Sequence, residues 1–170
     1  GWTGSSTTLK HFGLAIPFLK EIIEKYPNKI KIKLISDVNY ETDEIDIEFC
    51  KWNKESEVID IEYIDIGIMP LPDDKWSRGK CGFKGLQYMS LEIPTIMSPV
   101  GVNTEIIKDG ENGFLANTDE EWIEKLSSLI ESEELREKLG KAGRKTIEGK
   151  YSVEAVKHKW LDAFLSIINE

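Results

Sequence analysis

The sequence predicts an α/β fold in which a doubly wound, mostly parallel sheet is flanked by helices. Short apolar segments of strand character alternate along the chain with amphipathic helical segments. Two of these strands end in small-residue turns that each open a helix, as the connections of such a sheet do. The 170 residues, of which 40% are hydrophobic, suit one domain (residues 1–170) with a proper core.

The first half of the chain begins with a small-residue turn at residues 4–8 that leads into a helix over residues 7–26. Pro17 lies in the middle of this helix and should kink or split it. Residues 29–35 and 44–49 alternate apolar and charged side chains, which predicts strands with one solvated face. The connection between these strands is short for a crossover helix, so the pair is either parallel with a loop between or antiparallel.

The second half of the chain alternates in the same way. The expected elements are a helix at 55–64, strands at 65–71, 95–98 and 113–116, helices at 82–91 and 102–108, and helices after the capping residues Thr118, Ser132 and Ser152. Ligands of a doubly wound sheet bind beyond the carboxyl ends of its strands. The turns after the strands are therefore expected to converge on one crevice.

Charge is distributed unevenly along the chain. The formal net charge is −9, which argues against nucleic acid as the main partner. Residues 75–91 nevertheless contain no carboxylate, while Lys75, Arg78, Lys80 and Lys84 lie within the first ten of them. Cations at a strand-to-helix turn favour a phosphate or diphosphate ligand, because the first N–H groups of a helix have no internal partners. The alternative is a solvated basic loop.

Other residue types exclude several kinds of chemistry. Cys50 and Cys81 have neither metal-like spacing nor a disulfide framework, which suits a reducing cytosol, and Cys81 is expected to be a small packing residue. His11 and His158 lie in helical patterns without a nucleophile motif, so surface or core roles are predicted for them. The sequence contains no apolar run of about 20 residues that would span a bilayer.

The segment KCGFKGLQYMSLEIPTIMSPVGVNTEII, followed by DGENGFLA, resembles the C-terminal half of family 4 glycosyltransferases, which are retaining enzymes of the GT-B fold. The resemblance extends from GWTGSSTTL over essentially the whole chain. It implies a Rossmann-like domain that binds a nucleotide-diphosphate sugar and requires no metal or other cofactor. It further implies a cytoplasmic fragment that is inactive alone, because the N-terminal acceptor domain is missing; polysaccharide or glycoconjugate synthesis is typical of the family. Any contact with the inner face of the membrane would come from the missing domain.

The sequence departs from the family pattern at three places. Gln87 stands where the family has a ribose-binding glutamate, and Gly79 stands where the first glutamate of its pair would be. Ser5, Ser6 and Thr7 occupy the turn where the family has Arg and Lys. These departures favour, as an alternative, a non-catalytic nucleotide-sugar-binding or interaction domain. Part of a sugar-nucleotide epimerase is a third interpretation.

Site roles follow from the resemblance and from local chemistry. The diphosphate is expected to contact Ser5, Ser6, Thr7, Lys80, Gly82, Phe83 and Lys84, with the Phe83 side chain itself in the core. Gln87 is expected to contact the ribose and Trp52 to stack on the base, while Asn103 and Thr104 are expected to touch the sugar. The structural alternatives are helix capping for the hydroxyl and amide residues, a solvated face for Lys80, Lys84 and Gln87, and a rim aromatic for Trp52. Asp73 and Asp74 are expected to hold Arg78 and Lys80 in place.

Overall fold

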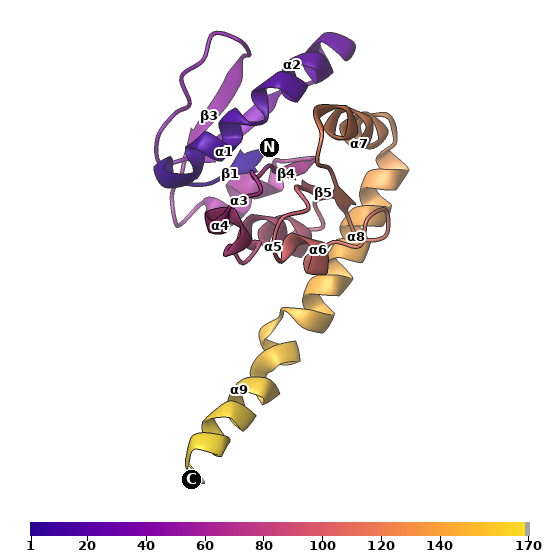
Figure 1. The fold of residues 1–170 in the computed structure, drawn as a ribbon. Coiled ribbons are helices and arrows are strands. Elements are labelled where there is room, and N and C mark those ends of the chain that lie inside the picture. Colours follow the sequence, from indigo (N-terminus) through magenta and orange to yellow (C-terminus); the bar gives the residue numbers. More distant parts are fainter. Residues whose placement is uncertain (169–170) are drawn as a thin grey trace.

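The computed structural model describes residues 1–168 and confirms the α/β class (Figure 1). Two three-stranded sheets form the centre of the molecule, and every strand pair within them is parallel. The first sheet contains β1 (Trp2–Thr3), β2 (Ile32–Ser36) and β3 (Ile47–Lys51), and the second contains β4 (Gly67–Met69), β5 (Thr95–Met97) and β6 (Phe114–Leu115). The open question about the second and third strands is thereby settled, since β2 and β3 pair parallel through a loop.

The two sheets are joined along β1 and β4. The amino group of Gly1 donates to the Ile66 carbonyl at 2.7 Å, and the Ile68 N–H donates to the Gly1 carbonyl at 3.0 Å. In a parallel pair of strands, one residue hydrogen-bonds to two residues of the neighbouring strand that are two positions apart. The spatial order is therefore β3-β2-β1-β4-β5-β6, the doubly wound order in which the chain changes direction between β1 and β4.

Helices cover both faces of this sheet. In chain order they are η1 (Ser6–Thr8), α1 (Leu9–Gly13), α2 (Ile16–Lys25), α3 (Glu57–Glu62), α4 (Lys75–Arg78), α5 (Phe83–Ser90), α6 (Asn103–Ile106), α7 (Asp119–Glu131), α8 (Glu133–Lys150) and α9 (Val153–Ile168). α2 packs beside α7 on one face, and α5 packs beside α8 on the other (Figure 1). The stacked rings of Phe18 and Trp122, with centroids 4.7 Å apart, lock α2 onto α7.

The predicted helix over residues 7–26 is divided into η1, α1 and α2. Pro17 falls in the first turn of α2, where its missing N–H breaks no helical hydrogen bond, so it starts a helix and does not kink one. Further along, α4 replaces part of a predicted polar loop. The sequence pattern did not reveal α4 because four residues carry no apolar periodicity.

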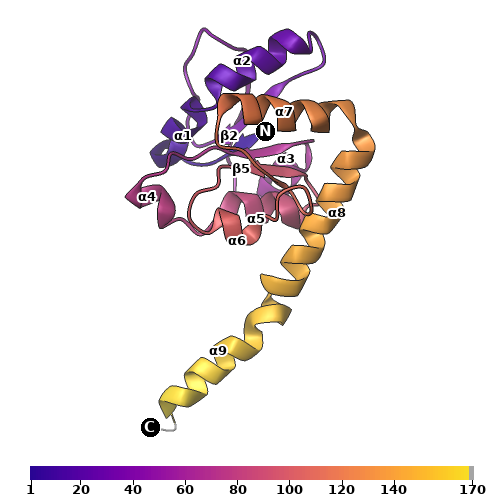
Figure 2. The ribbon, with the colours of Figure 1, turned by 45° about the vertical axis from the view of Figure 1, so that its right-hand side comes forward.

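The last helix, α9, extends away from the body of the molecule (Figure 2). Its large apolar side chains are exposed, among them Trp160 and Phe164, whose rings lie 6.5 Å apart. Within residues 1–168, no helix is both long and apolar enough to cross a membrane.

Candidate functional site

The site predicted from the sequence lies where the sheet changes direction. β1 and β4 are neighbours, so the turns that follow their carboxyl ends lie at the same edge of the sheet. The turn after β1 opens η1 and α1, while the segment after β4 carries α4 and then α5. Both turns therefore bring polar residues to one edge of the sheet.

The turn after β1 is already engaged by a carboxylate. Asp37, the first residue after β2, accepts from the Ser6 N–H at 2.5 Å and from the Ser6 hydroxyl at 2.9 Å. These hydrogen bonds, with a weaker one from Ser36, hold the pKa of Asp37 below its usual value. The hydroxyls of Ser5 and Thr7 lie 2.8 Å apart and bond each other. A phosphate reaching Ser6 would therefore have to displace Asp37, whose role the sequence analysis did not foresee.

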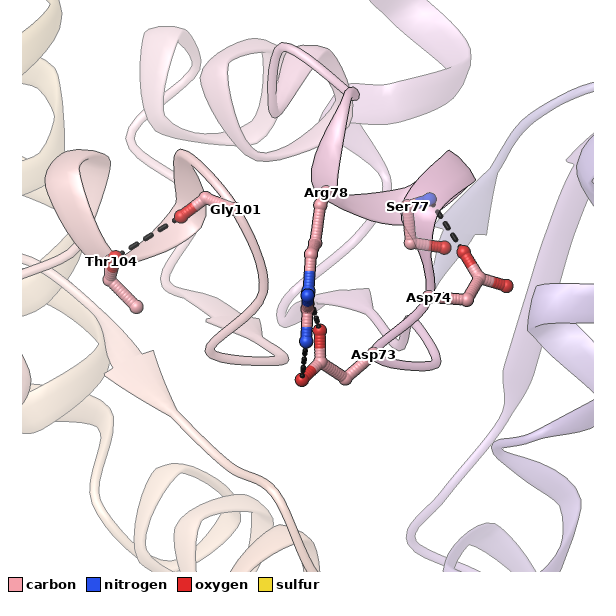
Figure 3. Close-up of polar contacts among 6 residues, drawn as sticks. All are labelled: Asp73, Asp74, Ser77, Arg78, Gly101 and Thr104. Carbon is pink, nitrogen blue, oxygen red and sulfur yellow. Dashed lines mark hydrogen bonds and ion pairs between the residues drawn. The ribbon is translucent and has the colours of Figure 1, made fainter.

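The α4 segment is stabilised by its own carboxylates (Figure 3). Asp74 caps the helix by accepting from the Ser77 N–H at 2.7 Å. The Arg78 guanidinium bonds both oxygens of Asp73, at 2.6 and 2.9 Å, and both side chains are exposed. Asp73 thus holds Arg78 as expected, whereas Asp74 caps α4. Arg78 is therefore neutralised before any ligand arrives.

The start of α5 has a different environment. Its capping residue, Gly82, has φ +70°, and a Cβ there would lie 2.3 Å from Ile106 Cδ1, so the turn favours glycine. Two residues on, Lys84 is half-buried, with Nζ 5.2 Å from the centroid of the Trp2 ring on β1. Burial, and then the charge of Lys80, lowers the pKa of Lys84 from 10.5 to about 8. Lys84 therefore lies over β1, where the sheet changes direction.

The remaining phosphate candidates surround this lysine. Lys80 is half-buried, with Nζ 5.9 Å from the Trp76 ring. Phe83 is 59% exposed, so the expectation that its side chain belongs to the core is wrong. The first helical position directs it away from the sheet. Cys81 is also exposed, which overturns its expected packing role.

The candidates for ribose and base lie further along the same edge. On α5, Gln87 donates from Nε2 to Glu57 Oε1 at 3.1 Å, so its amide joins α5 to α3. Trp52 directly follows the edge strand β3 and is 41% exposed. Neighbouring strands are about 4.8 Å apart, so β3 lies about 10 Å from β1, roughly the span of a nucleoside.

The two residues assigned to the sugar differ in accessibility. Asn103 is 1% exposed, and its Nδ2 donates to the Ser98 carbonyl at 2.9 Å, which fixes the turn after β5. Thr104 is exposed and donates to the Gly101 carbonyl at 3.1 Å (Figure 3). Gly101 itself has φ +56°, and a Cβ there would lie 2.6 Å from the Arg78 carbonyl. The α6 turn therefore approaches the end of α4 closely.

One residue near the site was assigned only a structural role. His11 on α1 is 2% exposed, so a core position is confirmed, yet neither of its ring nitrogens has a hydrogen-bond partner. Burial lowers the pKa of His11, and Lys80, Lys10 and Lys84 lower it further against an opposing effect of Asp74. His158 lies exposed on α9. No periodicity in the sequence indicates that His11 lies beside the site lysines.

Two further features bear on the location of the site. Among the described residues, no group of three or more His, Cys, Asp or Glu side chains is placed to hold a metal ion. A cavity of about 560 Å³ opens at the opposite edge of the sheet, beside Gly1 and Ile32 at the amino ends of the strands. Ligands of doubly wound sheets bind at the carboxyl ends. The position of the charged residues therefore favours the Lys84 edge over this cavity.

The sheet is doubly wound, which defines a Rossmann-like domain. A half-buried lysine lies over the place where the sheet changes direction, and such a position suits an anionic ligand. Residues 18–146 match the family described as glycosyl transferases group 1. The chain belongs to this family, and the resemblance seen in the sequence is confirmed.

Curated relatives are similar over less than half of the chain. The Bacillus subtilis spore coat protein SA is 32% identical over 79 residues, which cover 45% of this chain and 21% of that protein. The Staphylococcus aureus capsular polysaccharide biosynthesis glycosyltransferase CapM is 32% identical over 77 residues, covering 44% and 20%. The matched part thus spans about a fifth of the length of these relatives.

Solved structures share the fold over most of the chain. The C-terminal domain of a group 1 glycosyl transferase, LpcC from Francisella tularensis, superposes with a TM-score of 0.69 at 20% identity, covering 89% of this chain and 85% of that one. Anabaena HepE, solved in complex with UDP and glucose, gives a TM-score of 0.75 at 14% identity, covering 97% and 48%. The fold is therefore that of the C-terminal half of GT-B glycosyltransferases.

Proposed function

We propose that this chain is the donor-binding domain of a retaining glycosyltransferase and binds a nucleotide-diphosphate sugar at the carboxyl edge of β1 and β4. The observation that carries the proposal is the position of Lys84. It is half-buried over Trp2, the positive charge of Lys80 acts on it, and it lies in the first turn of α5. Burial and a neighbouring positive charge both disfavour the charged form of this lysine. A bound anion would offset both effects, which explains why a lysine occupies this position.

The helix itself adds to this attraction. α5 has eight residues, and its first N–H groups face the same edge as Lys84. Gly82, Phe83 and Lys84 can therefore offer backbone donors to the distal phosphate while Lys80 and Lys84 supply charge. Ser5, Ser6 and Thr7, in the turn after β1, would provide further donors once the phosphate displaces Asp37 from Ser6.

The rest of the nucleotide fits the remaining candidates. Gln87 lies one helical turn beyond Lys84, within the reach of a ribose, and Trp52 offers an exposed ring to a base. Thr104 is exposed on the α6 side, where the sugar would lie, whereas Asn103 would act by fixing the turn beneath it. HepE, which shares this fold, was solved with UDP and glucose.

In this proposal the domain promotes transfer by stabilising the departing nucleotide diphosphate. Negative charge develops on the phosphate as the bond to the sugar breaks, and fixed cations and helix N–H groups lower the energy of that state. No metal or other cofactor and no nucleophile from this domain are needed. The acceptor would be held by a domain N-terminal to this one, and synthesis of a polysaccharide or glycoconjugate in the cytoplasm is the expected setting.

A second candidate is a binding domain without catalytic activity, or part of a sugar-nucleotide epimerase. Gln87 and Gly79, where the resemblance leads us to expect acids, favour the binding domain without catalytic activity. This alternative predicts the same nucleotide affinity, so binding alone does not separate the two. Restoring a longer chain that includes an acceptor domain should give sugar transfer only if the first proposal is correct.

Calorimetric titration of the 170-residue chain with UDP, GDP and ADP tests the proposal directly. One diphosphate is expected to bind, and the matching monophosphate should bind at least about tenfold more weakly, because the distal phosphate meets Lys84 and the start of α5. Equal affinity for the mono- and diphosphate, or no binding of any of the three, would show that the edge is not a diphosphate site.

A further inference from the structure

His11 has a feature that donor binding does not explain. Its side chain is 2% exposed, and both ring nitrogens are buried without a hydrogen-bond partner in the described part of the chain. Buried polar groups are nearly always hydrogen-bonded, because an unpaired one loses its contacts with water and gains none. An imidazole kept in this state is a candidate for a group that changes its charge or partner during function.

Two of the four charged groups that act on His11 belong to the proposed donor site. Lys10 lies on its own helix, Lys80 on the loop between α4 and α5, and Lys84 on α5. Asp74, the capping residue of α4, is the carboxylate among these neighbours. Two of the three lysines are those expected to meet the diphosphate. The charge state of His11 therefore depends on whether an anion neutralises them.

We propose that His11 takes up a proton when the diphosphate of the donor binds at Lys80 and Lys84, and so acts as a positioning residue that links donor affinity to pH. This inference rests on the proposed function. A bound diphosphate cancels the repulsion that keeps the imidazole neutral and adds attraction of its own. The imidazolium is then attracted to Asp74, whose Oδ1 caps α4 at the Ser77 N–H.

The direction of the pH dependence follows from linkage. If His11 binds protons more tightly in the complex than in the free chain, binding consumes protons. Donor affinity then falls as the pH rises through the interval between the free and bound pKa values. In the free chain the pKa of His11 is below 6.5, so this interval begins below 6.5 and is distinct from the effect of Lys84, whose pKa is about 8.

Histidine ring NMR of the 170-residue chain measures this coupling. The sequence contains two histidines, and His158, exposed on α9, serves as the internal control. The probes are UDP-glucose, GDP-mannose and ADP-glucose, whose diphosphates carry no group that titrates between about pH 5 and 8. Saturating the chain with the nucleotide sugar that binds should raise the pKa of His11 by about one unit and leave His158 unchanged. One unit corresponds to a change of about tenfold in donor affinity between the free and bound pKa values.

Two variants complete the test. Lys84→Met should raise the pKa of His11 without any ligand, because it removes a positive charge, whereas Lys141→Met on α8 should not. His11→Asn should bind the same nucleotide sugar within about twofold at pH 8. Below pH 6.5, where Lys84 is already charged, this variant should lose the proton uptake that the parent chain shows on binding, which calorimetry in buffers of different ionisation enthalpy detects.

The possible outcomes separate the two proposals. If a nucleotide sugar binds while His11 keeps its pKa and no proton is taken up, the role of His11 is refuted and the donor site stands. If the His11 pKa responds to Lys84→Met but none of the three nucleotide sugars binds, the donor site is refuted, and the inference that depends on it is refuted as well. If Lys84→Met leaves His11 unchanged, the electrostatic coupling itself is wrong.

Discussion

The two helical segments that follow β4 differ in how they are tied to the sheet. The side-chain hydrogen bonds of α4 lie within its own segment, because Asp74 caps the helix and Arg78 pairs with Asp73. The side chain of Trp76 is 70% exposed. α5 is anchored to β1, because the fully buried hydroxyl of Tyr88 accepts from the Thr3 N–H at 2.9 Å.

This difference divides a run of cations that looks uniform in the sequence. Arg78 is exposed and already neutralised, whereas Lys84 is half-buried over Trp2 and has Lys80 as its charged neighbour. Arg78 and Lys84 contribute equally to the net charge of the chain. Burial and pairing therefore make Lys84, and not Arg78, the residue that we propose to bind the ligand.

The largest expected effect is on nucleotide binding by Lys84→Met. The change should weaken the diphosphate that binds by about 1.5–3 kcal/mol, the range for hydrogen bonds to charged groups. Arg78→Met should change the dissociation constant by no more than about twofold, because Asp73 already neutralises that guanidinium. Lys141→Met, in an exposed pair with Glu137, is the control for a change in net charge. Similar losses for Arg78 and Lys84, measured by calorimetry, would contradict the division.

Gly82→Ala should destabilise the fold by about 1–2 kcal/mol, the cost of a left-handed conformation for a residue with Cβ. The matched change is Gly79→Ala at the end of α4, where φ is −84° and the nearest atom to an added Cβ lies at 3.5 Å. That variant should stay within about 0.5 kcal/mol of the parent chain. Urea denaturation of both variants measures the difference, and equal stabilities would show that the start of α5 is not geometrically constrained.

The sequence predicted well those parts of the fold that depend on local pattern. The strands β4 and β5, the helix α5 and the caps of α7 and α8 follow from apolar runs, glycines and capping residues. Strand direction does not, because alternation of side chains is the same in parallel and antiparallel pairs. The pairing of β2 with β3 therefore required the structure.

The candidate site was predicted only in part. Lys84 was found because cations, a glycine turn and a helix start lie close together in the sequence. Asp37 and His11 were not, because the interactions join residues far apart in the chain: Asp37 bonds Ser6 across 31 positions, and the charges of Lys80 and Lys84 lower the pKa of His11. Such pairs leave no periodic signal. The exposed ring of Phe83 shows the same limit, since apolar character alone does not determine which way a side chain points.

The pH dependence of nucleotide binding should follow the charge of half-buried Lys84 and not that of exposed Arg78. Lys84 loses its charge as the pH rises through about 8, so the affinity for the diphosphate should fall about tenfold by one unit above that value. Folding stability has the opposite dependence: the folded chain binds fewer protons than the unfolded one between about pH 8 and 10.5, so the free energy of unfolding rises with pH there. Both effects should disappear in Lys84→Met and persist in Arg78→Met.

The smallest expected effect comes from Asp73→Asn, which releases Arg78 from its ion pair. Both side chains are exposed, so thermal unfolding should be unchanged within error. The diphosphate should bind no more than about twofold more tightly, because the freed charge is screened by water and salt. Glu137→Gln makes the same charge change in an exposed pair on α8 and should have no effect. A tenfold gain for Asp73→Asn would make Arg78 a principal phosphate ligand and would remove the distinction between α4 and α5.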